Sequence, residues 1–560
     1  MITRRIWLGA LAGLGVGTAT FRRALAQLAQ DDGGITVENL QQAQWISGYE
    51  LTADEQAAIL THVNSGERQL QALRRFPIDH DVSPAVCFQT LAHTEGPDVL
   101  PNRAAAPREA HAGVRPTQDD QLAFLPVSEL APLIRTRQVS SEELTDLYLR
   151  RLKRFDPLLK CVVTLTEDLA LKQARQADRE IAAGHYRGPL HGIPWGAKDL
   201  MSVAGYPTTW GIPAFADRCL DRNATVYERL RDAGAVLVAK TSLGALAMGD
   251  QWFRGMTRNP WNPQQGSSGS SAGSVAATVA GLVGFSMGSE TLGSIMTPSA
   301  RCGATGLRPT FGRISRDGCM PLSWTMDKLG PICRSADDCA LVLDAIHGAD
   351  GRDPTAVNRP FKWPTDIDFR RLRIGHLARH ADQFDRAPWS CLQELGCQLV
   401  EVELPSGFPL GALIQTINIE GASVFEDMLR ARETEGWNTW PNSFRAAQFV
   451  SAVDYVRAMR VRRQLMEAFD ALMERVDILV NCSDLMQTNL TGHPSVIFPT
   501  AIEERDGRWR PQSTVFTGRL FDEARLLTIA AACQQRIGPL ALPPLEQWLA
   551  QDADNDDVED

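Results

Sequence analysis

The chain has 560 residues, of which 44% are hydrophobic and 22% are charged, and its net charge at pH 7 is −10. This length is ample for a large buried core, and the composition is typical of a soluble globular protein. The negative charge provides no basic field, so it excludes nucleic acid as an expected partner.

The N-terminus carries a candidate export signal. Arg4 and Arg5 precede an apolar run over residues 6–20, and small residues at 24–26 offer a cleavage site. The run is too short for a comfortable membrane span. We expect residues 1–26 to be a twin-arginine signal peptide and the protein to be periplasmic or secreted. An uncleaved membrane anchor or a buried N-terminal helix is the alternative, since two further arginines precede the cleavage site.

Residues 31–115 are expected to form an N-terminal helical extension followed by a strap. The segment 36–76 predicts two or three helices, one of them with Thr52 as N-cap and Glu55 three residues later. The segment 79–116 is rich in Pro, Ala and His and predicts an extended strap. This strap either shapes the entrance to a site or is a plain packing arm.

Residues 120–545 alternate predicted strands with predicted helices, which favours a large mixed α/β sheet with helices on both faces. Trp437 and Trp440 either line a pocket or pack between surface helices. The last residues, 551–560, are acidic and expected to be disordered. The main expected elements are two helices within 127–155, helices at 166–183, 335–348 and 521–534, and strands at 161–164, 189–199, 235–239, 372–374 and 477–480.

The Gly/Ser-rich stretch from Gly266 to Gly306 stands out from the rest of the chain. It predicts a loop, a small-residue helix at 274–281, a strand at 282–287, a second Gly/Ser turn and a second helix near Thr297-Pro298. Such loops expose N–H groups and hydroxyls, as an oxyanion or phosphate site requires. A flexible linker is the alternative, but a linker does not carry a helix and a buried strand.

This stretch resembles the amidase signature family, whose hydrolases use a Ser–cis-Ser–Lys triad. The matching segments are Gly192–Asp199, Gly269–Ser274, Gly288–Ile295 and Cys302–Thr310. The lysine, the first serine and the second serine occur in the family's order, and the two serines are 24 residues apart (294 − 270). The resemblance implies the amidase signature fold for residues 120–545.

The resemblance also implies the catalytic residues. Ser294 would be the acylated nucleophile, and Ser270, after a cis peptide bond, would bridge it to Lys198. A serine needs a base, and the sequence shows no convincing Ser-His-Asp arrangement. A lysine can be that base only when it is neutral, which burial favours, and the neighbours of Lys198 are apolar. A structural lysine paired with Asp199 is the alternative.

The remaining site residues also follow from the resemblance. The oxyanion hole would consist of the N–H groups of Leu292, Gly293 and Ser294, with Thr291 nearby. The segment Ala247-Met248-Gly249 would contact the substrate.

The chain departs from the family pattern at three positions near the nucleophile. Leu292 stands where glycine is frequent, Met296 where arginine is frequent, and Glu290 where aspartate is common. Leu292 contributes its backbone, so catalysis is expected to survive. Met296 removes a charge beside the site, so the resemblance does not assign this chain to a particular subfamily or give it that subfamily's substrate.

The leading hypothesis is an exported amidase that hydrolyses a small-molecule amide and needs no metal or organic cofactor. The alternatives are the glutaminase subunit of a tRNA-dependent amidotransferase and a catalytically silent binding protein of the same fold. No stable membrane span is expected, and a homodimer remains open. The 11 cysteines lack metal-site spacing and are expected to be mostly buried free thiols, with a disulfide open if the protein is periplasmic.

Overall fold

The computed structural model describes residues 34–78, 82, 84–86, 113–482, 484–505 and 508–551. The predicted signal peptide, most of the predicted strap and nearly all of the acidic tail lie outside these residues. Contacts divide the chain into two compact units. The first comprises Met1–Cys87 with Gly407–Leu465, and the second comprises Phe88–Ser406 with Met466–Asp560.

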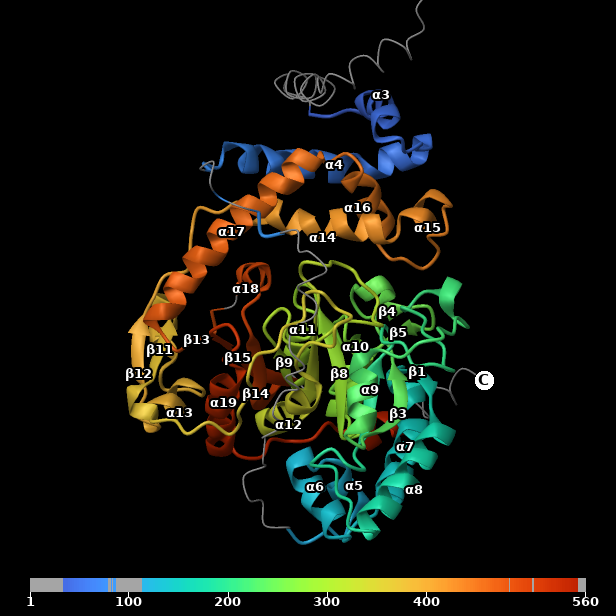
Figure 1. Ribbon diagram of the computed structural model, residues 1–560, viewed down its shortest axis with the longest axis vertical. Helices are drawn as coiled ribbons and strands as arrows, with labels where there is room; N and C mark the ends of the chain where they lie inside the picture. Colours follow the sequence, from blue (N-terminus) through green and yellow to red (C-terminus); the bar gives the residue numbers. More distant parts are fainter. Residues whose placement is uncertain are drawn as a thin grey trace, which may run out of the picture. The chain divides into compact units, whose positions relative to one another are not determined.

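The second unit is built on a sheet that has eleven strands among the described residues (Figure 1). Most of these strands are largely buried, in agreement with their apolar sequences. In spatial order they are β1 (Val162–Leu165), β3 (Val236–Thr241), β2 (Pro194–Lys198), β8 (Phe285–Glu290), β10 (Lys328–Cys333), β9 (Thr305–Arg308), β14 (Ser495–Arg505), β15 (Arg508–Gly518), β13 (Ile478–Val480), β11 (Arg373–His376) and β12 (Gln398–Glu401).

The sheet is mixed, as predicted. β2 runs parallel to β3 and β8, whereas β8 pairs antiparallel with β10. The ladder continues antiparallel through β9, β14, β15 and β13 and ends in the parallel strands β11 and β12. Because β2 and β8 are parallel neighbours, their C-terminal ends meet at one edge of the sheet.

Helices flank this sheet, which confirms the predicted fold class. α12 and α19 lie side by side against β9 and β14 (Figure 1). Among the described residues, the helices of this unit are α5 (Asp119–Ala123), α6 (Val127–Arg135), α7 (Ser141–Leu159), α8 (Glu167–Ala182), α9 (Thr225–Asp232), α10 (Ala272–Val279), α11 (Met296–Cys302), α12 (Ala336–Ile346), α13 (Trp389–Glu394), the part of α17 (Ala452–Arg475) from Met466, α18 (Leu485–Thr491) and α19 (Glu523–Ile537).

Short elements complete the second unit. They are the two-stranded pairs β4 (Gln251–Trp252) with β5 (Gly255–Met256) and β6 (Arg258–Asn259) with β7 (Asn262–Gly266), and the 3₁₀ turns η2 (Pro213–Phe215), η3 (Ala245–Ala247), η4 (Phe369–Arg371) and η5 (Ala378–Gln383).

The strand after the small-residue helix begins later than its apolar sequence predicts. Residues 282–287 were expected to be extended, but β8 spans Phe285–Glu290. Gly281 has a φ of 64°, and the amide of Leu282 donates to the carbonyl of Ala277. Residues 281–284 therefore close the end of α10, and the strand starts after this turn.

Among the described residues, the helices of the first unit are α3 (Val37–Ser47), α4 (Ala53–Arg75), α14 (Leu410–Val424), α15 (Glu426–Arg430), α16 (Trp440–Ala447) and the part of α17 (Ala452–Arg475) up to Leu465. Thr52 caps α4 and forms a reciprocal capping box with Glu55, as predicted. The sequence placed residues 407–465 with the catalytic body, whereas the contacts group them with the N-terminal helices.

Aromatic residues form part of the core of the first unit. Trp437 and Trp440 are both buried, and Trp440 stacks on Phe444 at 4.7 Å between ring centroids. The packing interpretation of these tryptophans is therefore correct. The Tyr49 hydroxyl donates to the Leu429 carbonyl at 2.9 Å, which ties the segment after α3 to the end of α15.

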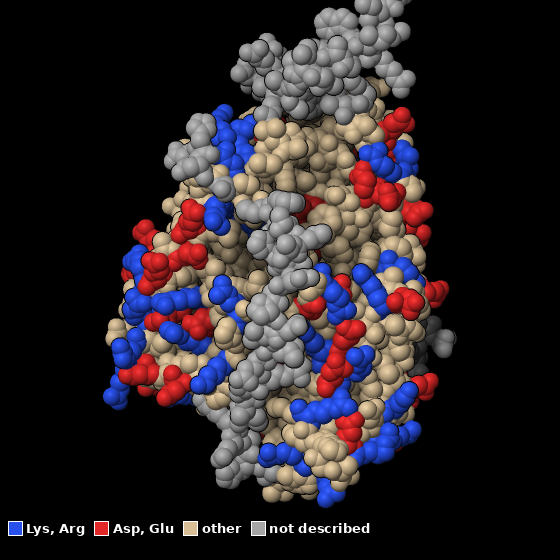
Figure 2. All heavy atoms as spheres, viewed as in Figure 1, with Lys and Arg blue, Asp and Glu red and all other residues tan. Residues whose placement is uncertain are grey.

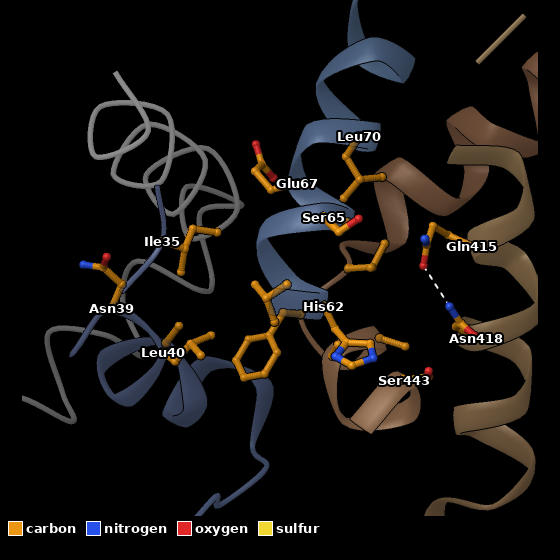
Figure 3. A pocket seen from close by; sticks show the side chains of 17 residues that line it. Ile35, Asn39, Leu40, His62, Ser65, Glu67, Leu70, Gln415, Asn418 and Ser443 are labelled. Carbon is orange, nitrogen blue, oxygen red and sulfur yellow. Dashed lines mark hydrogen bonds between the residues drawn. The ribbon is translucent and has the colours of Figure 1, made fainter. Parts of the chain in front are cut away.

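A cavity of about 130 Å³ lies among the helices of the first unit (Figure 3). Leu40, His62 and Leu70 line one side of it, and Gln415 and Asn418 line another, joined by a hydrogen bond of 3.0 Å. The lining is mixed in polarity, and none of the predicted site residues belongs to it.

Three further observations on the described residues concern membrane spans, surface charge and cysteines. None of their helices is long and apolar enough to cross a membrane. On the face drawn in Figure 2, the described acidic and basic side chains are interspersed. The ten cysteines within the described ranges are free.

Candidate active site

Three segments of the second unit converge where β2 and β8 end. β2 ends at Lys198, β8 leads into the loop 291–295, and α10 is preceded by the loop 267–271. The amide of Ser271 donates to the carbonyl of Ser294 at 3.1 Å, which ties the two Gly/Ser loops together. The fold thus brings the predicted lysine and both predicted serines into one region.

Lys198 is fully buried among serine side chains. Its Nζ lies 2.8 Å from the Oγ of Ser270, 2.9 Å from the Oγ of Ser289 and 3.1 Å from the Oγ of Ser271. Burial lowers the pKa of Lys198 from 10.5 to about 7, although the negative charges of Asp327 and Glu290 act in the opposite direction. Near neutral pH a substantial fraction of this amine is therefore unprotonated and able to accept a proton.

Asp199 does not pair with Lys198. Its Oδ1 forms a buried ion pair with the Nζ of Lys240 at 2.6 Å, and its Oδ2 accepts hydrogen bonds from the backbone and hydroxyl of Thr209. The alternative of a structural Lys198–Asp199 pair is therefore wrong, because Lys240 on the neighbouring strand neutralises this carboxylate.

Ser270 follows a cis peptide bond from Gly269, as the resemblance implies. A Cβ on Gly269 would lie 1.8 Å from the carbonyl oxygen of Gly249, so only glycine fits there. The amide of Ser268 also donates to Asp250 at 2.8 Å. The predicted substrate segment Ala247-Met248-Gly249 therefore lies directly against the loop that carries Ser270.

Ser294 lies in the loop before α11 and is 9% exposed. Among the described residues, its Oγ has no hydrogen-bond partner. Thr297, in the first turn of α11, donates its hydroxyl to the carbonyls of both Gly269 and Gly293, at 2.9 and 2.8 Å. The nucleophile candidate is thus nearly buried, and Thr297 fixes its loop from the first turn of α11.

The predicted oxyanion donors have free amides. Within the described part of the chain, the N–H groups of Leu292, Gly293 and Ser294 donate to no acceptor. Gly293 has a φ of 85°, a conformation that favours glycine. The hydroxyl of Thr291 is engaged elsewhere, since it donates to Asp327 at 2.6 Å.

Glu290 fixes the chain on the other side of the nucleophile. Its Oε2 accepts from the amides of Ile295 and Met296 at 2.8 and 3.0 Å, and its Oε1 accepts from Arg308 and Asn489. Burial raises the pKa of Glu290, but the nearby positive charges and hydrogen bonds outweigh it and lower the pKa to about 2. Arg308 and Lys328 are the cations that act on Glu290, and Met296 contributes no charge there.

Sequence reasoning missed several residues of this region. Ser271 and Ser289 flank Lys198, and both belong to segments that were recognised, so their position there was the available signal. Asp327 and Asn489 also lie in segments that resemble the family, but their contacts with Thr291 and with Glu290 at the end of β8 join residues 36 and 199 positions apart. No local pattern predicts contacts at such separations.

Comparisons with known proteins show what the whole chain is similar to. The model of the Amidase family matches residues 143–495. The chain is 34% identical over 473 residues to a putative amidase AmiD of Mycobacterium bovis, covering 77% of this chain and 98% of that protein. It is 31% identical over 479 residues to a glutamyl-tRNA(Gln) amidotransferase subunit of Carboxydothermus hydrogenoformans, covering 74% and 98%.

A similar solved structure is the native peptide amidase from Stenotrophomonas maltophilia. Its TM-score to this chain is 0.66 and its sequence identity is 30%, over 75% of this chain and 98% of that chain. The similarity thus extends over nearly the whole of the solved protein.

Proposed function

The chain belongs to the amidase family and is an amide-hydrolysing enzyme, and from this premise we propose that it cleaves the C–N bond through an acyl-enzyme on Ser294. In this proposal Lys198 is the base and Ser270 is the proton relay. The observation that carries it is the 2.8 Å contact between the Nζ of fully buried Lys198 and the Oγ of Ser270.

In the first half-reaction, neutral Lys198 takes the proton of the Ser270 hydroxyl while Ser270 takes the proton of Ser294. The Oγ of Ser294 attacks the amide carbon, and a tetrahedral intermediate forms. Its oxyanion accepts hydrogen bonds from the amides of Leu292, Gly293 and Ser294. Each such donor is worth about 3 kcal/mol of transition-state stabilisation.

Collapse of the intermediate completes acylation and prepares hydrolysis. The proton held by Lys198 returns through Ser270 to the nitrogen of the leaving amine, and the C–N bond breaks. Water then attacks the acyl-enzyme while the same two residues accept its proton. The acid is released, Ser294 regains its proton, and the enzyme returns to its initial state.

A second candidate function is that of a glutaminase component in a tRNA-dependent amidotransferase. The 31% identity to one component of such an enzyme favours it. The expected export signal at residues 1–26 counts against it, because that work is cytoplasmic. Ammonia release from glutamine that increases in the presence of a partner protein would identify this function.

The proposal includes export of the amidase by the twin-arginine route and a small-molecule amide as its substrate. A fusion of residues 1–40 to a reporter that is active only after folded export tests it. Replacing both Arg4 and Arg5 with lysine is expected to stop export, and continued export would contradict the twin-arginine assignment.

The activity itself is tested with a panel of neutral aryl, aliphatic and peptide amides. The wild type is compared with Ser294→Ala and Lys198→Ala, and release of the free acid is measured. The proposal expects turnover of at least one amide and a loss of at least about 10³-fold in both variants. Full activity of Ser294→Ala would show that the nucleophile is wrong.

A further inference from the structure

A single carboxylate outside the predicted triad joins the nucleophile loop to a second loop. Asp327 immediately precedes β10, whose first residue, Lys328, pairs with Glu290 at the end of β8. Continuing this antiparallel register by one residue places Asp327 opposite Thr291. The Oδ1 of Asp327 accepts the hydroxyl hydrogen of Thr291 at 2.6 Å.

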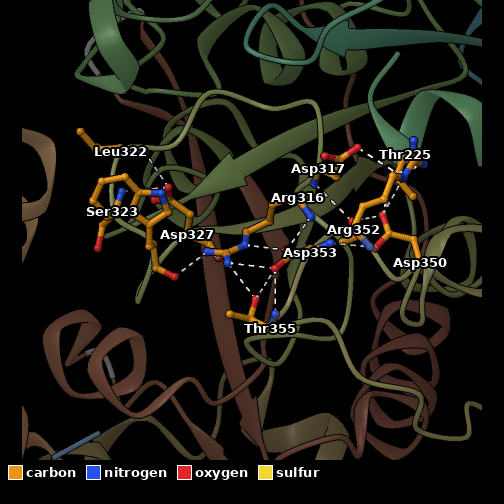
Figure 4. A network of polar contacts seen from close by, with 12 residues as sticks. Thr225, Arg316, Asp317, Leu322, Ser323, Asp327, Asp350, Arg352, Asp353 and Thr355 are labelled. Carbon is orange, nitrogen blue, oxygen red and sulfur yellow. Dashed lines mark hydrogen bonds and ion pairs between the residues drawn. The ribbon is translucent and has the colours of Figure 1, made fainter. Parts of the chain in front are cut away.

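The other oxygen of this carboxylate holds a tight turn. The Oδ2 of Asp327 accepts from the amides of Leu322 and Ser323 at 2.7 and 2.9 Å (Figure 4). The Asp327 carboxylate therefore accepts hydrogen bonds from two backbone amides of this turn and from the Thr291 hydroxyl of the nucleophile loop. Because both oxygens are used, the carboxylate cannot rotate without breaking contacts on both loops.

Arg316 holds the same turn from its other side. Its Nη1 donates to the carbonyl of Trp324 at 2.8 Å, and its Nε donates to Asp353 at 2.9 Å (Figure 4). The Asp353 carboxylate is itself fixed by Thr355. The position of Asp327 is therefore determined by a network that continues away from the site.

We propose that Asp327 is a positioning residue for the amide hydrolysis: by holding the Thr291 hydroxyl, its carboxylate fixes the loop whose next three amides, those of Leu292, Gly293 and Ser294, receive the oxyanion. This inference rests on the proposed function for its catalytic consequence. Thr291 is the residue at which β8 passes into this loop, so freedom at Thr291 moves all three donors. Oxyanion donors act only when they are preorganised toward the developing charge.

The same network contains a matched control. Thr225 is also a buried threonine that donates its hydroxyl to an aspartate, Asp350, at 2.5 Å (Figure 4). It lies at the start of α9, and its hydrogen bonds to other parts of the described chain go to Asp317, Asp350 and Arg352, none of which belongs to the loops that carry Ser270 and Ser294. A Thr→Val substitution removes one hydroxyl and preserves the shape of the side chain at either position.

The experiment compares Thr291→Val with Thr225→Val in the full-length protein. For an amide that the wild type hydrolyses, Thr291→Val is expected to lower kcat by about 10- to 100-fold with KM changed less than about threefold. Thr225→Val is expected to keep kcat within about threefold of the wild type, because it acts on stability alone. Asp327→Asn is expected to reduce kcat similarly, and Asp327→Asn combined with Thr291→Val should be no worse than the poorer single variant.

A second readout does not depend on catalysis. Hydrogen exchange of the peptide that spans residues 288–296 is followed by mass spectrometry, with Ser294→Ala included as an inactive but structurally intact reference. Thr291→Val is expected to speed exchange of this peptide by at least about tenfold, and Thr225→Val is expected to leave it unchanged. This comparison tests the role of Asp327 even if no amide is turned over.

The outcomes separate the two proposals. A wild type that hydrolyses no amide, or an active Ser294→Ala, overturns the proposed catalytic mechanism, and the hydrogen-exchange comparison then decides on Asp327. An active wild type with equal kcat values for Thr291→Val and Thr225→Val overturns the positioning role alone. Additive losses in the double variant, or unchanged exchange at 288–296 in Thr291→Val, also overturn it.

Discussion

The acid limb of the pH–rate profile is the sharpest consequence of burying Lys198. Its pKa is lowered from 10.5 to about 7, so the neutral amine, which is the form that the proposed mechanism requires, is gained as the pH rises through 7. At about 1.36 kcal/mol per pH unit, this displacement corresponds to a cost of about 5 kcal/mol for protonating Lys198 in its site rather than in water. That cost is the physical reason why a lysine can act as a base near neutral pH.

The expected fall of kcat/KM at low pH follows from the titration of Lys198 alone. For a neutral aryl amide, log kcat/KM is expected to rise with a slope of 1 below about pH 7 and then to level off. At pH 6 the rate constant should be about tenfold below the plateau, and at pH 5 about a hundredfold. Initial rates between pH 5 and 10, at substrate concentrations well below KM, measure this directly.

Two carboxylates shift the acid limb against the larger effect of burial. The charges of Asp327 and Glu290 raise the pKa of Lys198 against the effect of burial. Asp327→Asn is therefore expected to move the limb to lower pH, whereas Asp350→Asn, whose carboxylate does not act on the lysine, should not move it. A rate that keeps rising beyond pH 9, or that is flat from pH 5 to 9, would refute the assignment of Lys198 as the buried base.

Three further predictions concern stability and packing. Between pH 7 and 10.5 Lys198 is protonated in the unfolded chain but neutral in the folded one, so the free energy of unfolding of the wild type, relative to that of Lys198→Met, should increase by up to about 5 kcal/mol across this window. Chemical denaturation of both proteins at pH 6.5 and at pH 9.5 measures this difference, and a difference that is the same at both pH values would contradict the lowered pKa. Arg308→Met leaves Glu290 without its closest cation and should lower the free energy of unfolding by about 3–5 kcal/mol, with a smaller loss for Arg308→Lys, and equal effects of the two variants would speak against the buried pair. Gly269→Ala should abolish amide hydrolysis, because its Cβ would lie 1.8 Å from the carbonyl oxygen of Gly249, and an active Gly269→Ala enzyme would disprove this close approach.

The sequence could predict those parts of the site that are local along the chain. The serine loops and the lysine strand each form a short motif, and the resemblance of these motifs, in their order, to the amidase signature family is what grouped Lys198, Ser270 and Ser294. Capping is equally local: Thr52 accepts the amide of Glu55 three residues later, as the sequence predicts. The mixed sheet followed from the alternation of apolar strands with amphipathic helices.

Contacts between distant segments could not be predicted in this way. Asp327 reaches Thr291 across 36 residues, and this contact depends on the register of β8 with β10, which no single strand specifies. The composition of the first unit depends on contacts such as that from Tyr49 to Leu429, which span 380 residues. The lysine partner of Asp199 was missed for the same reason, because Lys240 lies on the neighbouring strand.

The identity of the acylated residue tests the central claim most directly. The full-length protein is treated with a serine-reactive fluorophosphonate probe, and the modified peptide is located by mass spectrometry. The account predicts one adduct, on Ser294, that forms much more slowly in Lys198→Ala and is absent from Ser294→Ala. An adduct on Ser270 or another residue, or undiminished labelling of Ser294→Ala, would contradict the proposed nucleophile.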